Sequence, residues 1–532
     1  MKKLLIIFIT GLSVACSDFL EPKSESEYIP KEASSLNEML LGEAYVSASN
    51  GVDILKTISW LDDDIMCSNV DAEEDGLDAD EYELCQAFFT WQPDACVTAE
   101  RLDKNEATWE IYYGVILGAN AALDYIDDVA GTEDEKNNVK AQALALRGYY
   151  YFQLVNFFGA PYNYDKKADG VPLKLTSALG SQELPRNSVE EVYTQVLEDL
   201  KEAERLYKSL PEDMQFKRNG RTSLPMVQLL LSRVYLYMEN WPEAAKYAQQ
   251  VIDNKNFSLA DLNTFISTQA EAYYNFATQE CPETIWVFGS VRGYWSDLDI
   301  MMKQEVVDKW GDTYSYSFYF LNASSDLVSR YLDNDLRKTK SLVSEVYLDK
   351  QTYKGVATGA YLPFGKFAIS KNSYGVPQVM TTSGQGYFAH TFRLSEAYLN
   401  LAEASVLRED EDGTVTALEA LNDLREKRYE NCTPLSGLTG DALLEKVREE
   451  RRLELCFEGH RWFDLRRYGM PAITHDWKVS DGEGGKIVTR YTLQEKDPFY
   501  TLPIPEYIME MNRALTQNPL PAKREGVQLS VE

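Results

Sequence analysis

MVQLLLSRVYLYMENWPEAAKYAQQVID, residues 226–253, decides the fold through the spacing of its large and small residues. Leu231, Ser232 and Tyr235 supply a large, a small and an aromatic position, and Ala244 and Ala248 supply two further small positions. Small residues allow two antiparallel helices to approach closely, and the large residues fill the groove between them. This is the spacing of a tetratricopeptide helix pair, so the stretch predicts one.

Further segments with helical periodicity indicate that such pairs repeat along the chain. Residues 392–428 repeat the pattern with a longer, acidic turn. Apolar residues recur at helical spacing over 107–129, and a second helix is expected over 140–159, where the final glycine suits a C-cap. Ser188, followed three residues later by Glu191, is a capping-box pattern at the start of another helix.

The composition changes between residues 255 and 390. Gly, Ser, Asn and Tyr dominate there and the helical periodicity fades, which is typical of loops and short strands. Loops on a rigid scaffold often contain binding residues. The predicted fold is therefore mostly α, a tetratricopeptide-like helix-pair scaffold with an irregular, loop-rich lobe that contains a few short strands.

The N-terminal segment MKKLLIIFITGLSVAC has the pattern of a secretory signal. Two lysines precede an apolar run that is too short to span a bilayer, and small residues precede Cys16. LSVAC resembles a bacterial lipobox, so we expect removal of residues 1–15 and acylation of Cys16; an ordinary signal peptide with an incidental cysteine is the alternative. Residues 16–30, which are polar and contain two prolines, would form a lipidated tether.

The acidic composition limits the partners of the chain. The formal net charge is −31 at pH 7, and loss of the two lysines in the signal segment makes it −33. Nucleic acids and anionic lipid surfaces attract basic proteins. We therefore expect no nucleic-acid partner, and contact with the membrane through the lipid anchor only.

Few residues are available for metal, cofactor or disulfide chemistry. The chain has three histidines, and its seven cysteines form no CxxC motif. DAEEDG, residues 71–76, resembles the start of a calcium loop, but Tyr82 stands where glutamate is needed. We expect neither a metal nor a cofactor. Cys67, Cys85 and Cys96 are close enough in sequence to form a disulfide, but free buried cysteines are common, so both states stay open.

CFEGHRWFDLRRYGM, residues 456–470, contains the residue types of an active site, but its charged residues are spaced as on the surface of a structural helix. Acidic and basic residues recur three positions apart, as on a helix surface, in the pairs Glu445–Arg448, Glu449–Arg452, Glu458–Arg461 and Asp464–Arg467. Gly459 is expected to break or bend the helix. Because no nucleophile or metal ligand stands at a recognisable spacing from His460, we predict a structural role for this segment.

The same residues carry a family resemblance. EERRLELCFEGHRWFDLRRYG, residues 449–469, resembles the signature of the SusD/RagB family of outer-membrane nutrient-binding lipoproteins. Four further segments are similar to the family pattern: RLSEAYLNLAEA (393–404), LPIPEYIMEMNRALTQNP (502–519), ALRGYYYFQLVNFFGAPY (145–162) and RNSVEEVYTQVLEDLKEA (186–203). The resemblance extends from Cys16 to near the C-terminus.

The resemblance implies a location, a partner and a function. Family members, mostly from Bacteroidetes, are lipid-anchored at the cell surface on the outer membrane. They cap a SusC-like TonB-dependent transporter and capture a glycan, or sometimes a peptide, without catalysis. The implied organisation is a signal peptide, a tether, an N-terminal region of helix pairs, a ligand-binding lobe and a C-terminal RagB/SusD-type helical region, over residues 1–15, 16–30, 31–254, 255–390 and 391–532.

A glycan site needs flat aromatic faces for the C–H surface of a sugar and polar groups for its hydroxyls. The aromatic candidates are Trp91, Tyr294, Trp295, Tyr314 and Tyr316. The nearby polar candidates are Gln92, Arg292 and Asp297. The strongly acidic body should disfavour anionic chains, so we expect a neutral oligosaccharide.

Two other functions stay open. An extracytoplasmic glycoside hydrolase would need two carboxylates at a set separation across a cleft, which a sequence alone does not reveal. A tetratricopeptide lipoprotein that binds only protein would use the concave face of its helices instead of aromatic residues on loops.

Overall fold

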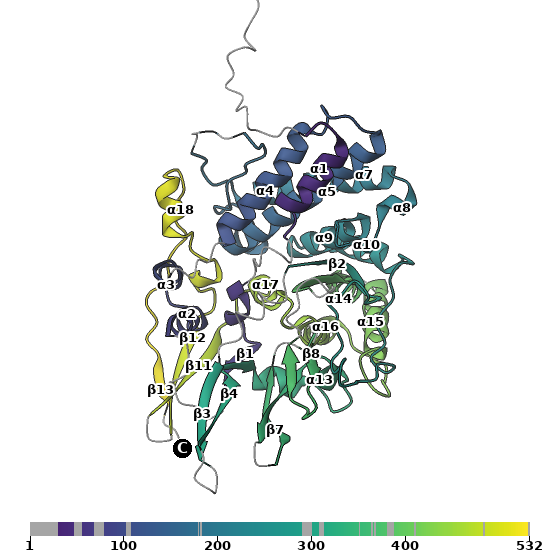
Figure 1. Cartoon of the computed structure of the whole chain (residues 1–532). Helices are drawn as coiled ribbons and strands as arrows, with labels where there is room; N and C mark the ends of the chain where they lie inside the picture. The colour runs from purple at the N-terminus through teal and green to yellow at the C-terminus, as the bar shows by residue number, and fades with distance from the viewer. Residues whose placement is uncertain are drawn as a thin grey trace, which may run out of the picture.

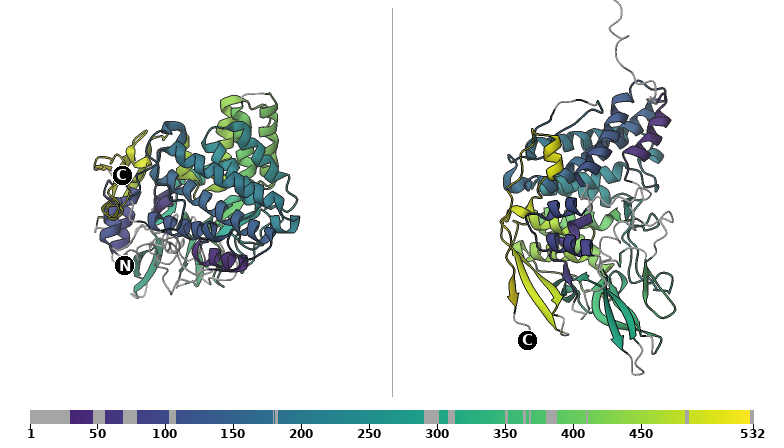
Figure 2. Two further views of the ribbon diagram at one scale, coloured as in Figure 1. Left: turned by 90° about the horizontal axis from the view of Figure 1, so that it is seen from above. Right: turned by 60° about the vertical axis from the view of Figure 1, so that its left-hand side comes forward.

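The computed structural model describes residues 30–46, 56–68, 79–102, 108–178, 180, 183–289, 301–307, 313–349, 352–362, 365–366, 369–379, 388–408, 411–481 and 485–529. These residues form a frame of helices and a lobe of short β hairpins (Figure 1). Seen from the side, the hairpins lie at the end of the molecule opposite α1 (Ala33–Glu43) and α7 (Val189–Ser209) (Figure 2).

The frame is built from long helices that pack in succession. In chain order they are α4 (Thr108–Tyr125), α5 (Glu133–Phe158), α7, α9 (Leu224–Tyr237), α10 (Trp241–Ile252), α14 (Leu394–Leu407), α15 (Glu411–Glu426) and α16 (Gly440–Leu455). Helix α5 packs between α4 and α7, and α14 packs against α10, α15 and α16. The chain therefore returns to the frame after the lobe, and helices from both halves share one core.

The helix pair predicted over residues 226–253 is confirmed as α9 and α10. Ser232, Ala244 and Ala248 are fully buried, and the Ser232 hydroxyl donates to the Ala244 carbonyl at 2.9 Å. A side-chain bond to the backbone of the opposite helix requires a close approach of the two axes, which the small residues permit.

The sequence predicted some helix ends correctly and placed others in the wrong position. The capping box at Ser188 is confirmed, and Gly159 is the C-cap of α5. Helix α5, however, begins at Glu133 rather than near residue 140, after a second capping box formed by Thr132 and Glu135. The charged first turns of α5 project beyond the apolar segment, so apolar periodicity alone placed the start too late.

Shorter helices cover the edges of the frame and the lobe. They are α2 (Ala79–Phe89), α3 (Ala95–Arg101), α6 (Tyr162–Asp165), α8 (Glu212–Gln215), α12 (Ser325–Arg330), α13 (Arg337–Lys340), α17 (Arg461–Arg467) and α18 (Glu506–Met511), with 3-10 turns η1 (Lys56–Trp60) and η2 (Pro498–Tyr500). None of the helices in the described ranges combines the length and the apolar character that crossing a bilayer requires.

The strands form small antiparallel sheets rather than one large sheet. The pairs are β1 (Ile65–Cys67) with β5 (Leu321–Ala323), β2 (Thr284–Phe288) with β10 (His390–Arg393), β3 (Met301–Val307) with β4 (Thr313–Tyr319), β6 (Val343–Asp349) with β7 (Lys354–Leu362), and β8 (Ile369–Lys371) with β9 (Pro377–Val379). Most of these strands lie between residues 255 and 390, so the predicted change from helices to short strands is confirmed.

The prediction of a helical C-terminal region is incomplete. Between residues 473 and 529 the chain forms a three-stranded sheet of β11 (Ile473–Ser480), β12 (Lys486–Leu493) and β13 (Val527–Leu529). Ile473, His475 and Trp477 are buried at alternate positions of β11. This period of two is the expected pattern of a strand with one face on the core, and it was available in the sequence.

Aromatic rings form much of the shared core. Tyr149 of α5 makes edge-to-face contacts with Trp286 of β2 and Phe392 of β10, at centroid distances of 5.5 and 5.6 Å. These contacts attach the β2–β10 pair to the frame. The six cysteines that the structure describes are all free thiols, and four of them are buried, so the core needs no disulfide there.

Candidate functional site

Ten charged side chains form a buried group, which we call the charge cluster, where α16 meets β10 and the loop before β2. Its members are Arg337, Lys366, Arg393, Arg425, Arg428, Glu283, Asp335, Glu450, Glu454 and Glu458. Each of its carboxylates accepts from at least one of its cations. A buried charge is tolerated only when it is paired, so these residues stabilise one another.

Glu454 lies at the centre of the charge cluster. Its carboxylate accepts hydrogen bonds from Arg337 and Arg428, both at 2.9 Å, and from Arg393. Burial opposes the ionisation of Glu454, but the three arginines outweigh burial and hold its pKa well below the usual range. Glu454 is therefore ionised at neutral pH and has no proton to donate, which fits a structural role and not acid catalysis.

The predicted helix-surface pairs around Gly459 are mostly wrong. Asp464 and Arg467 do pair, at 2.9 Å, but both are buried. Glu458 and Arg461 bind partners from other segments, because the chain leaves the helix before Gly459, which has a φ of +76°. The other two cations of that prediction also have different partners: Arg448 binds Glu403 and Arg452 binds Asp64.

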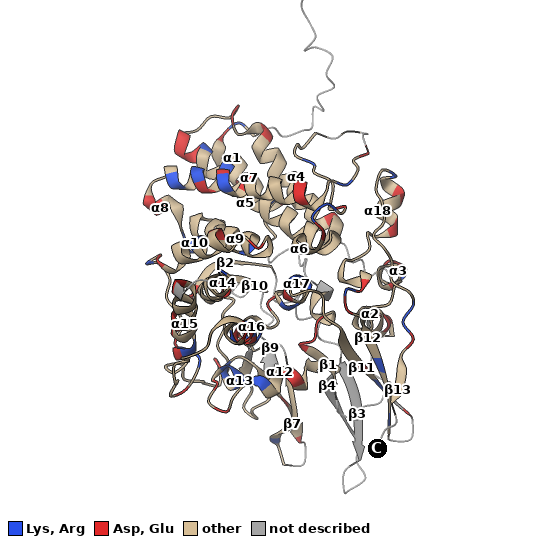
Figure 3. Cartoon of the chain, turned by 180° about the vertical axis from the view of Figure 1, so that it is seen from behind, with Lys and Arg blue, Asp and Glu red and all other residues tan. Residues whose placement is uncertain are grey.

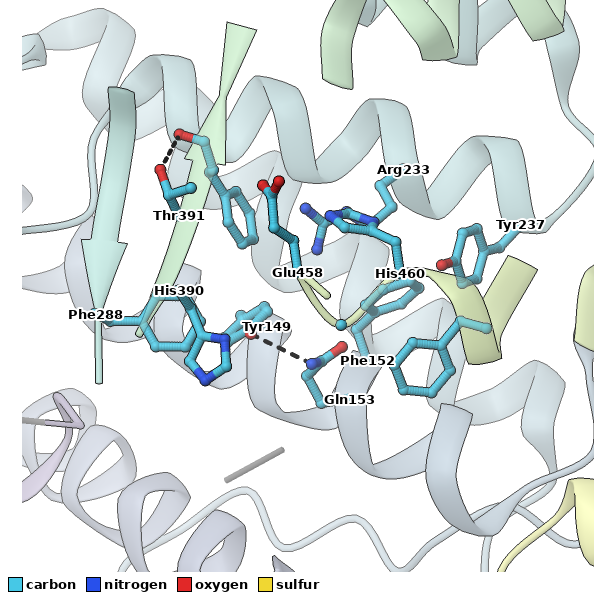
Figure 4. Close-up of a pocket in the computed structure, with 13 residues that line it drawn as sticks. Tyr149, Phe152, Gln153, Arg233, Tyr237, Phe288, His390, Thr391, Glu458 and His460 are labelled. Carbon is cyan, nitrogen blue, oxygen red and sulfur yellow. Dashed lines mark hydrogen bonds between the residues drawn. The ribbon is translucent and has the colours of Figure 1, made fainter. Parts of the chain in front are cut away.

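A small cavity lies inside the frame (Figure 4). Its polar lining includes Gln153 of α5, Arg233 of α9 and His460, which precedes α17. Arg233 is fully engaged by Glu396, with two bonds of 2.6 Å, and Gln153 donates to the Tyr149 hydroxyl at 3.3 Å. Because buried side chains surround this cavity and pair with one another, we assign it to the scaffold.

A larger, open groove lies beside the β1–β5 pair. Its polar lining combines carboxylates, an amine and hydroxyl groups from distant parts of the sequence: Asp63, Ser324, Ser325, Asp326, Asp476 and Lys478. Met66 and Ile473 add apolar surface. This mixture suits a ligand that presents both hydroxyl groups and apolar C–H faces.

Two arginines of the 449–469 motif hold the floor of the groove. Arg452 of α16 donates to Asp64 and to Asp326, in both cases at 2.6 Å. Arg461 of α17 forms a two-point contact with Asp63, at 2.6 and 2.8 Å. The guanidinium groups therefore connect the segment before β1 to α12, and these contacts stabilise the shape of the groove.

The acidic residues of the groove are poor proton donors. Burial opposes the ionisation of Asp63, but Arg461 and Arg452 lower its pKa to about 2. A hydrogen bond from Arg330 lowers the pKa of Asp326, and one from Arg490 lowers the pKa of Asp476. These carboxylates are ionised at neutral pH, so they can accept hydrogen bonds from hydroxyl groups but cannot act as general acids.

Three consecutive acids lie next to the groove floor. Oxygens of Asp62, Asp63 and Asp64 come within 4.8 Å of one another. Burial and repulsion by the other two carboxylates raise the pKa of Asp62 well above its ordinary value. Because Arg452 and Arg461 already neutralise the other two acids, we assign this group to charge pairing and not to a metal ion.

Trp91 is part of the core behind the groove. Its side chain is 0% exposed, and its indole nitrogen donates to the Leu61 carbonyl at 2.9 Å. The imidazole of His475 stacks between the rings of Phe89 and Trp91, at centroid distances of 4.1 and 4.3 Å. Trp91 therefore has no face open to a ligand in this structure, contrary to the exposed ring that the sequence analysis expected.

Of the other seven predicted site residues, the structure describes Gln92, Tyr314 and Tyr316. Gln92 is bonded to Arg524, with its amide donating to the carbonyl at 3.3 Å. Tyr314 and Tyr316 lie on β4, opposite Val306 and Gln304 of β3. Arg292, Tyr294, Trp295 and Asp297 lie outside the described residues. Their roles in ligand binding stay predictions.

Sequence reasoning missed the residues that line the groove. Asp63, Asp326 and Lys478 come from three separate segments and have no shared motif. The only sequence signal was indirect, because the arginines of the 449–469 motif needed acidic partners somewhere in the chain. Which acids they would meet depends on how those segments cross.

A frame of antiparallel helix pairs that holds a polar groove next to β hairpins defines a repeat-scaffold binding protein. Comparison with known proteins makes the class specific. The model of the SusD family matches residues 295–520, and a second model, described as starch-binding associating with outer membrane, matches residues 18–236. Together they cover most of the chain, which therefore belongs to the SusD/RagB family.

Individual relatives agree with this assignment. SusD-like protein P2 of Formosa agariphila is 26% identical over 380 residues, which cover 68% of this chain and 71% of the relative. A SusD superfamily protein from Bacteroides thetaiotaomicron has the same fold, with a TM-score of 0.66, 20% identity and coverage of 92% of this chain and 100% of the other. A SusD-like carbohydrate binding protein from Bacteroides vulgatus gives a TM-score of 0.62 at 22% identity, covering 91% and 98%.

Proposed function

We propose that this protein captures oligosaccharides at the cell surface and delivers them to a SusC-like TonB-dependent transporter in the outer membrane. It would be anchored through an acylated Cys16 and would have no catalytic activity. The observation that carries the proposal is the match of the N-terminal half to a model described as starch-binding associating with outer membrane. The groove beside β1 is the candidate location, since it offers ionised carboxylates and hydroxyl groups that can bind sugar hydroxyls.

The charges support a binding protein rather than a hydrolase. A glycosidase needs one carboxylic acid with a raised pKa beside a second carboxylate. The lining acids Asp63, Asp326 and Asp476 instead have lowered pKa values, because each is paired with an arginine. Asp62, next to Asp63, has a raised pKa, but it is buried and does not line the groove. The carboxylates of the charge cluster are likewise paired and buried.

A neutral ligand fits the electrostatics of the described surface. Figure 3 shows Lys and Arg residues interspersed with Asp and Glu along the helices of the frame. The net charge of −31 gives the whole chain a strongly negative field. An anionic glycan would be repelled at long range, whereas a neutral one would not.

Binding and catalysis can be separated in one set of measurements. Mature protein would be titrated by calorimetry with neutral oligosaccharides, such as maltoheptaose, cellohexaose, xylohexaose and laminarihexaose, and with a uronic-acid oligosaccharide. We expect binding of at least one neutral chain and no release of reducing ends after prolonged incubation. New reducing ends would support the hydrolase alternative, and binding of the uronic chain alone would contradict the neutral preference.

The anchor and the transporter need their own test. In cells that express the full chain, Cys16→Ala should abolish incorporation of labelled palmitate and release the protein from the outer-membrane fraction. A transporter recovered with the detergent-solubilised wild-type protein would support delivery. A wild-type chain that incorporates no lipid would contradict the proposed anchoring.

A further inference from the structure

Two exposed tyrosines lie side by side on the turns of neighbouring hairpins. Tyr353, at the turn between β6 and β7, is 64% exposed, and Tyr374, at the turn between β8 and β9, is 46% exposed. Their ring centroids are 6.4 Å apart and the ring planes are inclined by 42°. The β6–β7 hairpin ends at the lower edge of the lobe in Figure 1. We call these two residues the tyrosine pair.

A direct backbone contact holds the two turns together. The Gly355 amide donates to the Tyr374 carbonyl at 3.2 Å. A side chain at position 355 would have its Cβ 2.9 Å from that carbonyl oxygen and 2.7 Å from the Val346 side chain. Glycine is therefore needed for this approach, which sets the separation of the tyrosine pair.

Each turn is also held by its own hydrogen bonds. The Asn372 side chain accepts from the amides of Tyr374 and Val376, at 2.9 and 3.1 Å. On the other hairpin, the Tyr353 amide donates to the Asp349 carbonyl at 2.7 Å, and the Thr352 hydroxyl donates to the Asp349 carboxylate at 2.8 Å. Because both turns are already ordered, little further conformational entropy of the backbone is lost when a ligand binds to the two rings.

The backbone at Tyr353 is strained for a bulky residue. Its φ of +52° lies in the left-handed region, which residues other than glycine, asparagine and aspartate rarely adopt. This conformation is unfavourable for a residue with a side chain. Such strain persists where the surrounding structure imposes it, and it is common at ligand-binding sites.

We infer that the tyrosine pair is a contact site for a neutral oligosaccharide, with the two rings packing against the C–H faces of its sugars. The inference rests on the proposed function, because it names residues through which the glycan would be gripped. Tyrosine rings give a large rigid contact area, and their hydroxyl groups hydrogen-bond to water or sugar. The exposed polar side chains of Lys354 and Ser373 flank the rings and are available to sugar hydroxyls.

The location of the tyrosine pair is compatible with a ligand that also occupies the groove. Strand β7 packs against β5, and β5 pairs with β1 at the groove wall. The hairpin that presents Tyr353 is therefore fixed to the same wall, so a long chain could contact both places.

The test compares substitutions in the tyrosine pair with a matched control. The probe is whichever of maltoheptaose, cellohexaose, xylohexaose and laminarihexaose binds the mature wild-type protein. Tyr353→Ala and Tyr374→Ala should each weaken its affinity about tenfold, since an aromatic anchor can supply that much. Tyr353→Phe should bind nearly as wild type, because it keeps the ring. Tyr164→Ala on α6, where the tyrosine is 59% exposed and lies in the frame, should have no effect.

The outcomes separate this inference from the proposed function. If the wild type binds a probe and both alanine variants bind it equally well, the inference is wrong and the proposed function stands. If the wild type binds none of the probes, both are wrong. Thermal melts of all variants control for folding, and a loss of transporter recovery with unchanged glycan affinity would assign the pair to protein contact and overturn the inference.

Discussion

Tyrosine has opposite surroundings in the helical frame and in the hairpin lobe. Tyr149, Tyr150 and Tyr151, consecutive on α5, are at most 1% exposed. Their neighbours are other rings or backbone carbonyls, for example Ala44, whose carbonyl accepts from Tyr150 at 2.6 Å. The tyrosine pair of the lobe, in contrast, turns its rings to solvent. Tyrosine side chains thus stabilise the core of the frame, whereas in the lobe they are exposed and can contact a ligand.

Charged residues differ between the two regions in the same way. In the frame, arginines and carboxylates are buried and paired in the charge cluster. The 449–469 motif, which contributes several of them, is therefore structural although its composition resembles that of an active site. Beside the lobe, Asp326 and Asp476 line an open groove and have side chains 55% and 31% exposed. Residue composition therefore indicates little about function here unless it is combined with exposure.

The largest expected effect is the loss of one carboxylate from the charge cluster. Glu454→Gln removes a negative charge that three buried arginines share. Each arginine keeps another carboxylate, but the buried cluster loses one negative charge, and breaking a buried ion pair costs about 3–5 kcal/mol. Urea denaturation should show this decrease in the free energy of unfolding.

An exposed ion pair provides the control for that substitution. Glu202 pairs with Arg205 at 2.6 Å, but the two side chains are 40% and 64% exposed. Glu202→Gln should change the free energy of unfolding by less than about 1 kcal/mol. Equal effects of the two substitutions would contradict the view that burial makes the charge cluster structural.

A smaller effect is expected from removing single hydroxyl groups. Tyr150→Phe leaves the buried Ala44 carbonyl without its donor, so it should cost about 1–3 kcal/mol. Tyr374→Phe removes a hydroxyl from an exposed ring and should cost less than about 0.5 kcal/mol. Thermal melts of both variants measure the contrast directly, and a larger loss for Tyr374→Phe would reverse it.

The pH dependence of stability provides a subtler test of the frame. His460 is buried, and burial followed by the nearby cations Arg233 and Arg451 holds its pKa well below 6.5. The unfolded chain takes up a proton at this residue near pH 6.5, whereas the folded chain does not. The free energy of unfolding should therefore fall as pH drops below 6.5, by up to about 1.4 kcal/mol per pH unit.

Replacement of this histidine isolates its contribution. His460→Gln should make the dependence of unfolding free energy on pH shallower between pH 7.5 and 5.5, whatever its effect on absolute stability. Proton uptake on unfolding, measured by calorimetry in two buffers, should fall by up to one proton. An unchanged slope would mean that His460 is protonated in the folded protein.

Much of the frame was predictable because its signals are local. The helix pair over 226–253 followed from the spacing of small residues, and the start of α7 followed from Ser188 and Glu191. The β11–β12 hairpin was missed although Ile473, His475 and Trp477 alternate, because the family resemblance favoured helices there. Trp91 was misjudged, since a tryptophan in a short connecting segment gives no sign of whether another segment will cover it.

The sequence by itself determined the class of fold and the repeated helix pairs, because helix periodicity and capping depend on residues near one another in the chain. Only the tertiary structure decided which acids the arginines meet and which rings stay exposed. Arg452 reaches Asp64 and Asp326, and Tyr353 lies beside Tyr374, through crossings of segments that no local pattern encodes. Whether a side chain is buried and paired depends on which segments cross beside it. In this protein, that difference distinguishes the scaffold residues from the residues of the candidate site.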